Sequence, residues 1–253
     1  AWHLQAAQAG HALAQMDAAR ALQNQPDSLR ADLLQRAAQA GLPDAQHLWA
    51  GCLAQGSGVA QDRAQAFYWW EQAALVGHME AASEAGAALL AGDGTQADAK
   101  AALRWLRQAA DAGSAKAQWN LGGMYASGRG LALNIKQAFV WCQRAADQGF
   151  APAQATLGVL YERIGKPQEA LACLRHAADL GDAEAQYNLA MLLSKGEGGA
   201  QDLEAAFLYL ERAAQQGVAS AQSRLALHYG QGHGVAMDGV EAHKWLLLAS
   251  RRG

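Results

Sequence analysis

The stretch AQWNLGGMYASGRGLALNIKQAFVWCQRAADQG, residues 117–149, contains two helix-like segments separated by a glycine-rich turn. In its first half, Ala117, Leu121 and Tyr125 recur every four residues and form one apolar stripe, which is typical of an amphipathic helix. Gly128 follows, and glycine readily adopts the left-handed conformation that ends a helix. The stretch therefore predicts a helical hairpin, in which a helix A is followed by a helix B.

The same pattern recurs along the chain at a nearly fixed period. The phrase AAxxG, or a close variant of it, ends at glycines spaced 36 residues apart, with one interval of 32. These glycines are Gly41, Gly77, Gly113, Gly149, Gly181, Gly217 and Gly253, and an earlier copy ends at Gly10. Such a period predicts a repeat architecture. The expected repeats of a single domain, 1–253, are 1–10 (partial), 11–41 (divergent), 42–77, 78–113, 114–149, 150–181 (short), 182–217 and 218–253. We expect the chain to be a fragment of an array.

The glycine turn and the Lys136 that follows it raise the alternative of a phosphate-binding loop. Such a loop needs a buried strand before the glycines and a Lys-Ser or Lys-Thr pair after them, and this sequence has neither. The turn is also matched by QGSGVAQD (55–62), AGDGTQAD (91–98), KGEGGAQD (195–202) and QGHGVAMD (231–238). It is therefore interpreted as an elbow between two helices. The residues expected to cap each following helix B are Asp62, Asp98, Asn134, Asp202 and Asp238.

Composition excludes several classes of protein. The 253 residues carry 20 Lys and Arg against 23 Asp and Glu, for a net charge of −3, and the basic residues form no long run. This balance argues against nucleic-acid binding. No apolar run approaches about 18 residues, so we expect no direct membrane insertion. The chain begins at Ala1 without a starting Met or a signal-like segment, which leaves its compartment unknown, cytoplasmic or periplasmic.

The repeat of residues 117–149 and its copy AQYNLAMLLSKGEGGAQDLEAAFLYLERAAQQG, residues 185–217, resemble the Sel-one-like repeat, a relative of the tetratricopeptide repeat. The resemblance covers about six repeats from Leu42 to Gly253. It implies an all-α fold, a right-handed α-solenoid superhelix of about seven antiparallel helix-turn-helix repeats, with helix A lining the concave side. The divergent repeat has QNQPDS in place of the glycine elbow, and the short repeat has RIGKPQ.

The large side chains that recur at the same position of each repeat are interpreted as core residues rather than as ligand-binding residues. One position of helix B repeatedly carries tryptophan, and one position of helix A repeatedly carries leucine, so both are expected to pack between repeats. The tryptophans are Trp69, Trp105, Trp141 and Trp245, and the leucines are Leu121, Leu157, Leu189 and Leu225.

The side of helix A that faces away from the apolar stripe is left free for binding. Aromatic anchors, amides and a cation along this row are what a groove for a protein or peptide partner needs. The candidates are Trp119, Asn120, Tyr187, Asn188, Met191, Arg224 and Leu227, and His47, Leu48 and Glu84 extend the row. The sequence thus favours a non-catalytic scaffold or adaptor without a cofactor. Whether Trp119 and Tyr187 line the groove or pack between repeats is left open.

Two alternatives remain beside the scaffold. Relatives rich in cysteine have been described as penicillin-binding or weakly β-lactamase-like, which keeps a small-molecule-binding or hydrolytic protein open, although no Ser-x-x-Lys motif occurs here. His228, His233 and His243 gather in the last repeat, but their spacing matches no recognised metal site, so no metal is expected. The other alternative is a spacer or a module for end-to-end self-association. Cys52, Cys142 and Cys173 are expected to be free thiols, which slightly favours the cytoplasm.

Overall fold

The computed structural model describes residues 11–21 and 27–250, and every regular element in these ranges is an α-helix. The partial repeat expected at residues 1–10 lies outside them. The chain divides into two compact units, residues 1–134 and 135–253. The predicted all-α solenoid of helical hairpins is confirmed, whereas a single continuous domain stays a prediction.

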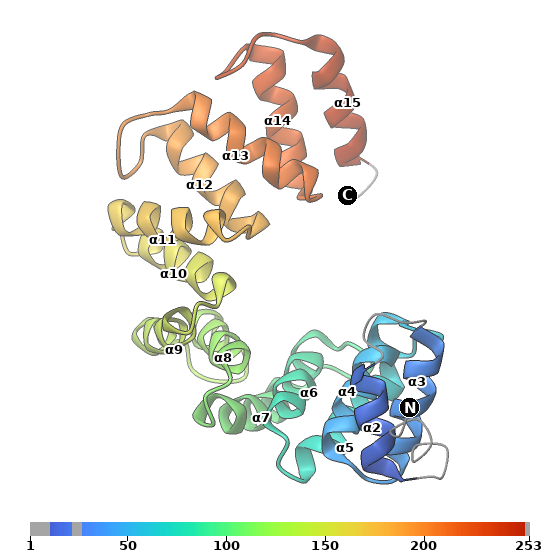
Figure 1. Ribbon diagram of the computed structural model, residues 1–253. Coiled ribbons are helices and arrows are strands. Elements are labelled where there is room, and N and C mark those ends of the chain that lie inside the picture. The colour runs from blue at the N-terminus through green and yellow to red at the C-terminus, as the bar shows by residue number, and fades with distance from the viewer. Residues whose placement is uncertain (1–10, 22–26, 251–253) are drawn as a thin grey trace. The chain divides into compact units, whose positions relative to one another are not determined.

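In the first unit each helix packs against the next one along the chain (Figure 1). The pairs α4 with α5 and α6 with α7 are the A and B helices of two predicted repeats, and α8 is the helix A of a third. The helices are α2 (Ala12–Ala21), α3 (Asp27–Gln39), α4 (Pro43–Gln55), α5 (Arg63–Leu75), α6 (Met79–Ala91), α7 (Ala99–Asp111) and α8 (Ala115–Ser127).

The second unit repeats the same arrangement, beginning with a helix B. Here α10 with α11, α12 with α13, and α14 with α15 form the hairpins (Figure 1). The helices are α9 (Ile135–Asp147), α10 (Ala151–Arg163), α11 (Pro167–Asp179), α12 (Ala183–Lys195), α13 (Leu203–Gln215), α14 (Ala219–Gln231) and α15 (Gly239–Ser250).

The elbows end and restart helices as the sequence predicts. The first elbow glycine closes helix A in the left-handed conformation, for example Gly128 at φ +72° after α8. Four aspartates then accept hydrogen bonds from backbone N–H groups in the first turn of the next helix B, which confirms the expected caps. They are Asp62, Asp98, Asp202 and Asp238. The cap expected at Asn134 stays a prediction.

The second elbow glycine has a role that the sequence did not reveal. At Gly130, a Cβ atom would lie 2.7 Å from the carbonyl oxygen of Ala99, at the start of the preceding helix B. Gly94, Gly198 and Gly234 would meet the first carbonyl of the preceding helix B in the same way. This elbow therefore packs directly on the backbone of the neighbouring repeat, which only glycine permits.

The core follows the predicted leucine and tryptophan positions. Leu121, Leu157, Leu189 and Leu225 are all at most 2% exposed. Trp141 and Trp245 are buried, whereas Trp69 and Trp105 are half-buried. Trp69 packs against the core of the first unit. The interpretation as core is confirmed for the four leucines, Trp141 and Trp245, whereas Trp105 lines a surface hollow and its core role stays a prediction.

A buried glutamine joins successive repeats. Gln186, 4% exposed, donates through Nε2 to the carbonyl of Ala178, near the end of the preceding helix B. Its Oε1 accepts a hydrogen bond of 2.9 Å from Gln216. The equivalent bonds from Gln46, Gln118 and Gln222 lead to Ala38, Ala110 and Ala214. The amide therefore fixes how helix A is seated on the preceding helix B.

We expect the Gln186→Leu variant to lose about 1 kcal/mol of unfolding free energy, because an apolar side chain forms neither hydrogen bond. Urea denaturation followed by circular dichroism measures this loss. Gln215→Leu on the exposed end of α13 serves as the control and should change stability by less than about 0.5 kcal/mol. Equal effects of the two changes would contradict the role assigned to the buried amide.

Candidate functional site

The structure brings together three of the predicted row residues in the second unit. Met191 of α12 and Arg224 and Leu227 of α14 line one hollow of about 370 Å³, together with His228 and His233. Leu227 is 46% exposed although it is a large apolar side chain. Two consecutive A helices therefore present an apolar surface beside a cation.

Tyr187 and Asn188 do not line this hollow. Tyr187 is half-buried and packs against the core of the second unit, so only part of its ring is accessible. Asn188 is half-buried beside it. Of the two positions that the sequence left open between groove and packing, Tyr187 takes part in packing, and its role in a groove stays a prediction.

In the last repeat, the side chain of His228 contacts the backbone of His233. His228 is 7% exposed, and its Nδ1 lies 2.7 Å from the carbonyl oxygen of His233. Because a carbonyl only accepts, His228 carries its proton on Nδ1. Burial lowers the pKa of the His228 imidazole, against the opposing effect of its hydrogen bond to the His233 carbonyl. His228 is therefore a neutral side chain that holds the elbow after α14.

In the first unit, Trp119 and Asn120 of α8 are half-buried. The amide nitrogen of Asn120 is inaccessible to solvent and finds no hydrogen-bond partner within the described part of the chain. Neighbouring this row, Lys116 of α8 forms an ion pair of 2.7 Å with Glu84 of α6. This ion pair thus connects the A helices of two adjacent repeats.

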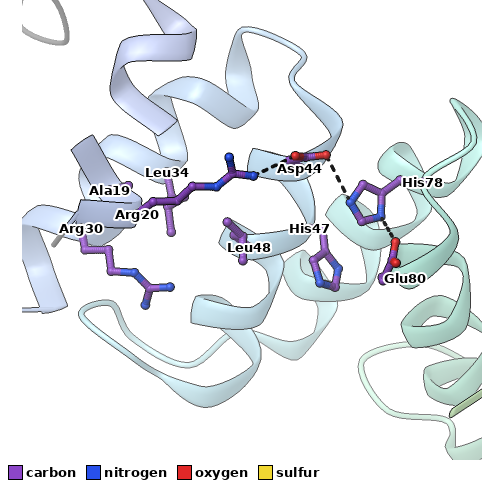
Figure 2. Close-up of a pocket in the computed structure, with 9 residues that line it drawn as sticks. All are labelled: Ala19, Arg20, Arg30, Leu34, Asp44, His47, Leu48, His78 and Glu80. Atoms are coloured by element: carbon purple, nitrogen blue, oxygen red, sulfur yellow. Dashed lines mark hydrogen bonds and ion pairs between the residues drawn. The ribbon is translucent and has the colours of Figure 1, made fainter. Parts of the chain in front are cut away.

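A larger hollow, of about 660 Å³, lies where α2, α3, α4 and the start of α6 meet (Figure 2). Arg20 forms an ion pair of 2.9 Å with Asp44, and His78 lies 3.5 Å from Asp44 on one side and 3.5 Å from Glu80 on the other. Figure 2 shows these four side chains as a chain of contacts along one wall. His78 also caps α6, since its Nδ1 accepts the N–H of Ala81.

A second hollow of about 350 Å³ shares Arg30, His47 and Leu48 with the first. Its walls include Trp70 of α5 and the Glu84–Lys116 pair. The two hollows together are called the first-unit cleft below. The sequence pointed to His47, Leu48 and Glu84 in this region, but not to Arg20, Arg30, Asp44, Trp70 or His78. The one available signal was His78, which occupies the helix-capping position held by Ser114 and Asp182 in other repeats.

The electrostatics of the first-unit cleft favour a neutral His47. Its ring stacks on that of His78 with centroids 4.9 Å apart. Burial is the main cause of the lowered pKa of His47, and His78 lowers it further, against the opposing effect of Glu84. At neutral pH His47 is therefore an uncharged donor or acceptor.

Other chemistry finds little support among the described residues. They include no group of three or more His, Cys, Asp and Glu side chains placed to hold a metal ion. No disulfide joins Cys52, Cys142 and Cys173, and burial raises the pKa of Cys142 to about 12. A thiol with such a pKa stays protonated and is a poor nucleophile. No helix within the described ranges is long and apolar enough to cross a bilayer.

The fold and the exposed faces of its A helices define an α-solenoid repeat protein. The chain belongs to the Sel1 repeat family. This family matches residues 43–78, 80–114, 115–150, 151–182, 183–218 and 219–253. No curated protein sequence matches the chain.

Two solved structures share the fold at moderate identity. A Sel1 repeat protein from Oxalobacter formigenes has 28% identity and a TM-score of 0.81, covering 94% of this chain and 96% of that one. Protective antigen c5321 of uropathogenic Escherichia coli strains, which displays an SLR fold, has 29% identity and a TM-score of 0.75. It is matched over 99% of this chain, which spans 56% of the antigen's length.

A more distant likeness shows the fold alone. The immunity protein Pa5087 from Pseudomonas aeruginosa has 22% identity and a TM-score of 0.58, with 85% of each chain covered.

Proposed function

We propose that this protein is a non-catalytic scaffold that binds a segment of a partner protein along the exposed face of its A helices. Membership of the Sel1 repeat family suggests a protein partner. The observation that carries the proposal is the hollow in the second unit, where Met191, Arg224 and Leu227 lie on successive A helices. An exposed leucine beside a methionine and an arginine offers both contact area and a directional cation.

Half-buried aromatic and amide side chains add to the same surface. Tyr187 and Asn188 on α12, and Trp119 and Asn120 on α8, lie next to core positions and expose only part of each side chain. Held by packing, they lose little rotamer freedom when a partner binds. The proposed surface is therefore largely preorganised within each unit.

The test is capture of the partner from a lysate of the source organism, with wild-type protein beside a Met191→Ala, Arg224→Ala, Leu227→Ala variant. We expect the variant to retain its helicity and bind the captured partner at least about tenfold more weakly, a loss of about 1.4 kcal/mol. Titration of the purified partner, followed by fluorescence anisotropy, measures the change.

A Leu208→Ala, Leu247→Ala variant is the matched control. Both leucines are about half exposed, at 52% and 49%, but they lie on helix B of their repeats. We expect this variant to bind like wild type. A partner that binds all three proteins equally would place its surface elsewhere and contradict the proposed role of the A helices.

A further inference from the structure

The first-unit cleft contains three buried nitrogen atoms that have no hydrogen-bond partner among the residues that the structure describes. They are Nε of Arg30, Nδ1 of His47 and Nε1 of Trp70. These side chains come from three consecutive helices, α3, α4 and α5, and all three line the same hollow. None of the three atoms is accessible to solvent as the side chains lie. Burying a hydrogen-bonding group without a partner costs about 1–3 kcal/mol, so a ligand that draws these side chains round to face it gains their hydrogen bonds.

Charge pairing distinguishes Arg30 from the other cations of the cleft. Arg20 is paired with Asp44, and Lys116 is paired with Glu84. Arg30 has no ion pair with any residue that the structure describes, and in Figure 2 no dashed line reaches it. The remaining carboxylate, Glu80, is 72% exposed and therefore solvated.

The chemistry of these donors selects the ligand. A guanidinium pairs best with a carboxylate or another oxyanion, to which it can donate two parallel hydrogen bonds. The indole of Trp70 is a donor only, and a neutral His47 donates from Nδ1 in the corresponding tautomer. One unpaired positive charge flanked by two neutral donors matches a singly charged carboxylate.

We propose that the first-unit cleft binds a carboxylate group of the partner segment, with Arg30 supplying the charge and the rings of Trp70 and His47 turning toward the carboxylate to supply further hydrogen bonds. This inference rests on the proposed function, because it assigns the chemistry of one contact of the bound segment. The carboxylate comes from an acidic side chain or from a chain terminus.

The test uses three probe peptides of equal length and the ¹⁵N-labelled full chain. They are acetyl-Ala-Ala-Glu-Ala-Ala-amide, acetyl-Ala-Ala-Gln-Ala-Ala-amide, and acetyl-Ala-Ala-Gln-Ala-Ala with a free terminal carboxylate. The indole N–H resonance of Trp70, assigned by its loss in Trp70→Phe, reports on the cleft directly. We expect one or both carboxylate peptides to shift it in a saturable way, whereas the neutral peptide leaves it in place. The tighter of the two carboxylate peptides identifies the source of the group.

Two variants distinguish the loss of the Arg30 charge from a loss of folding. Arg30→Gln should raise the dissociation constant of the carboxylate peptide at least about tenfold. Arg175→Gln, which removes an exposed arginine from α11, should leave that constant unchanged. Circular dichroism verifies that both variants are folded.

Three results would overturn the carboxylate site. They are an equal shift with the neutral peptide, no shift of the Trp70 resonance with any peptide at millimolar concentration, and full retention of affinity by Arg30→Gln. None of them bears on partner capture through Met191, Arg224 and Leu227, so failure of the carboxylate site and failure of the scaffold function are distinguishable.

Discussion

Replacing Gly94 by alanine should destabilise the first unit by roughly 2–4 kcal/mol, as the sum of a conformational cost and a steric one. Gly94 has φ +71°, in the region that L-residues avoid. Its added Cβ would also collide with the carbonyl of Arg63 at the start of α5, a backbone atom that cannot swing away as a side chain can. Urea denaturation followed by circular dichroism measures the loss.

Gly77→Ala separates the two costs. Gly77 also has a positive φ, +92°, but a Cβ there would have no neighbour within 4 Å. We therefore expect this variant to lose only the conformational part of the unfolding free energy, about 1–2 kcal/mol. If the two variants lost the same stability, the close packing of the elbow on the preceding repeat would be energetically unimportant.

The Leu189→Ala variant should destabilise the second unit by about 2–5 kcal/mol, because it leaves a cavity in a packed core. Leu189 is 0% exposed and belongs to the core cluster formed by α10 to α15. In a solenoid the contacts are local, so the damage should be greatest in the repeats next to α12. Hydrogen exchange resolved by mass spectrometry tests this, with faster exchange expected in α11 to α13.

Leu208→Ala provides the control for Leu189→Ala, since the same atoms are removed from a side chain that is 52% exposed. The expected change is within about 0.5 kcal/mol. Uniform faster exchange across both units in Leu189→Ala would show that the chain unfolds as one cooperative body instead.

Much of the fold could be predicted because its information is local. The spacing of Ala117, Leu121 and Tyr125 predicts helix A, a glycine such as Gly128 predicts its end, and an aspartate such as Asp62 predicts the start of helix B. Each signal depends on residues within one or two helical turns. Repetition along the chain then reinforced every weak signal, so the helices and the leucine core were confirmed.

The candidate site could be predicted only in part. Met191, Arg224 and Leu227 were placed on one face of the A helices by their phase, and the structure brings them into one hollow. The same phase argument gave Tyr187 as a candidate, yet its ring packs partly against the core. The position of a residue around its helix specifies the direction in which its side chain points. It does not specify how much of that side chain the neighbouring repeat covers.

The sequence by itself determined the helical hairpin, its period and the residues between repeats, because these follow from contacts a few residues apart. Only the tertiary structure decided that the second elbow glycine lies against the backbone of the preceding repeat. Likewise, it brought Arg30, His47 and Trp70 to one cleft, where a buried nitrogen atom of each has no partner among the described residues. Those residues are separated by up to forty positions, and no local pattern encodes whether distant polar groups find partners. Pairing of that kind depends on how adjacent repeats stack, which is a property of the folded chain.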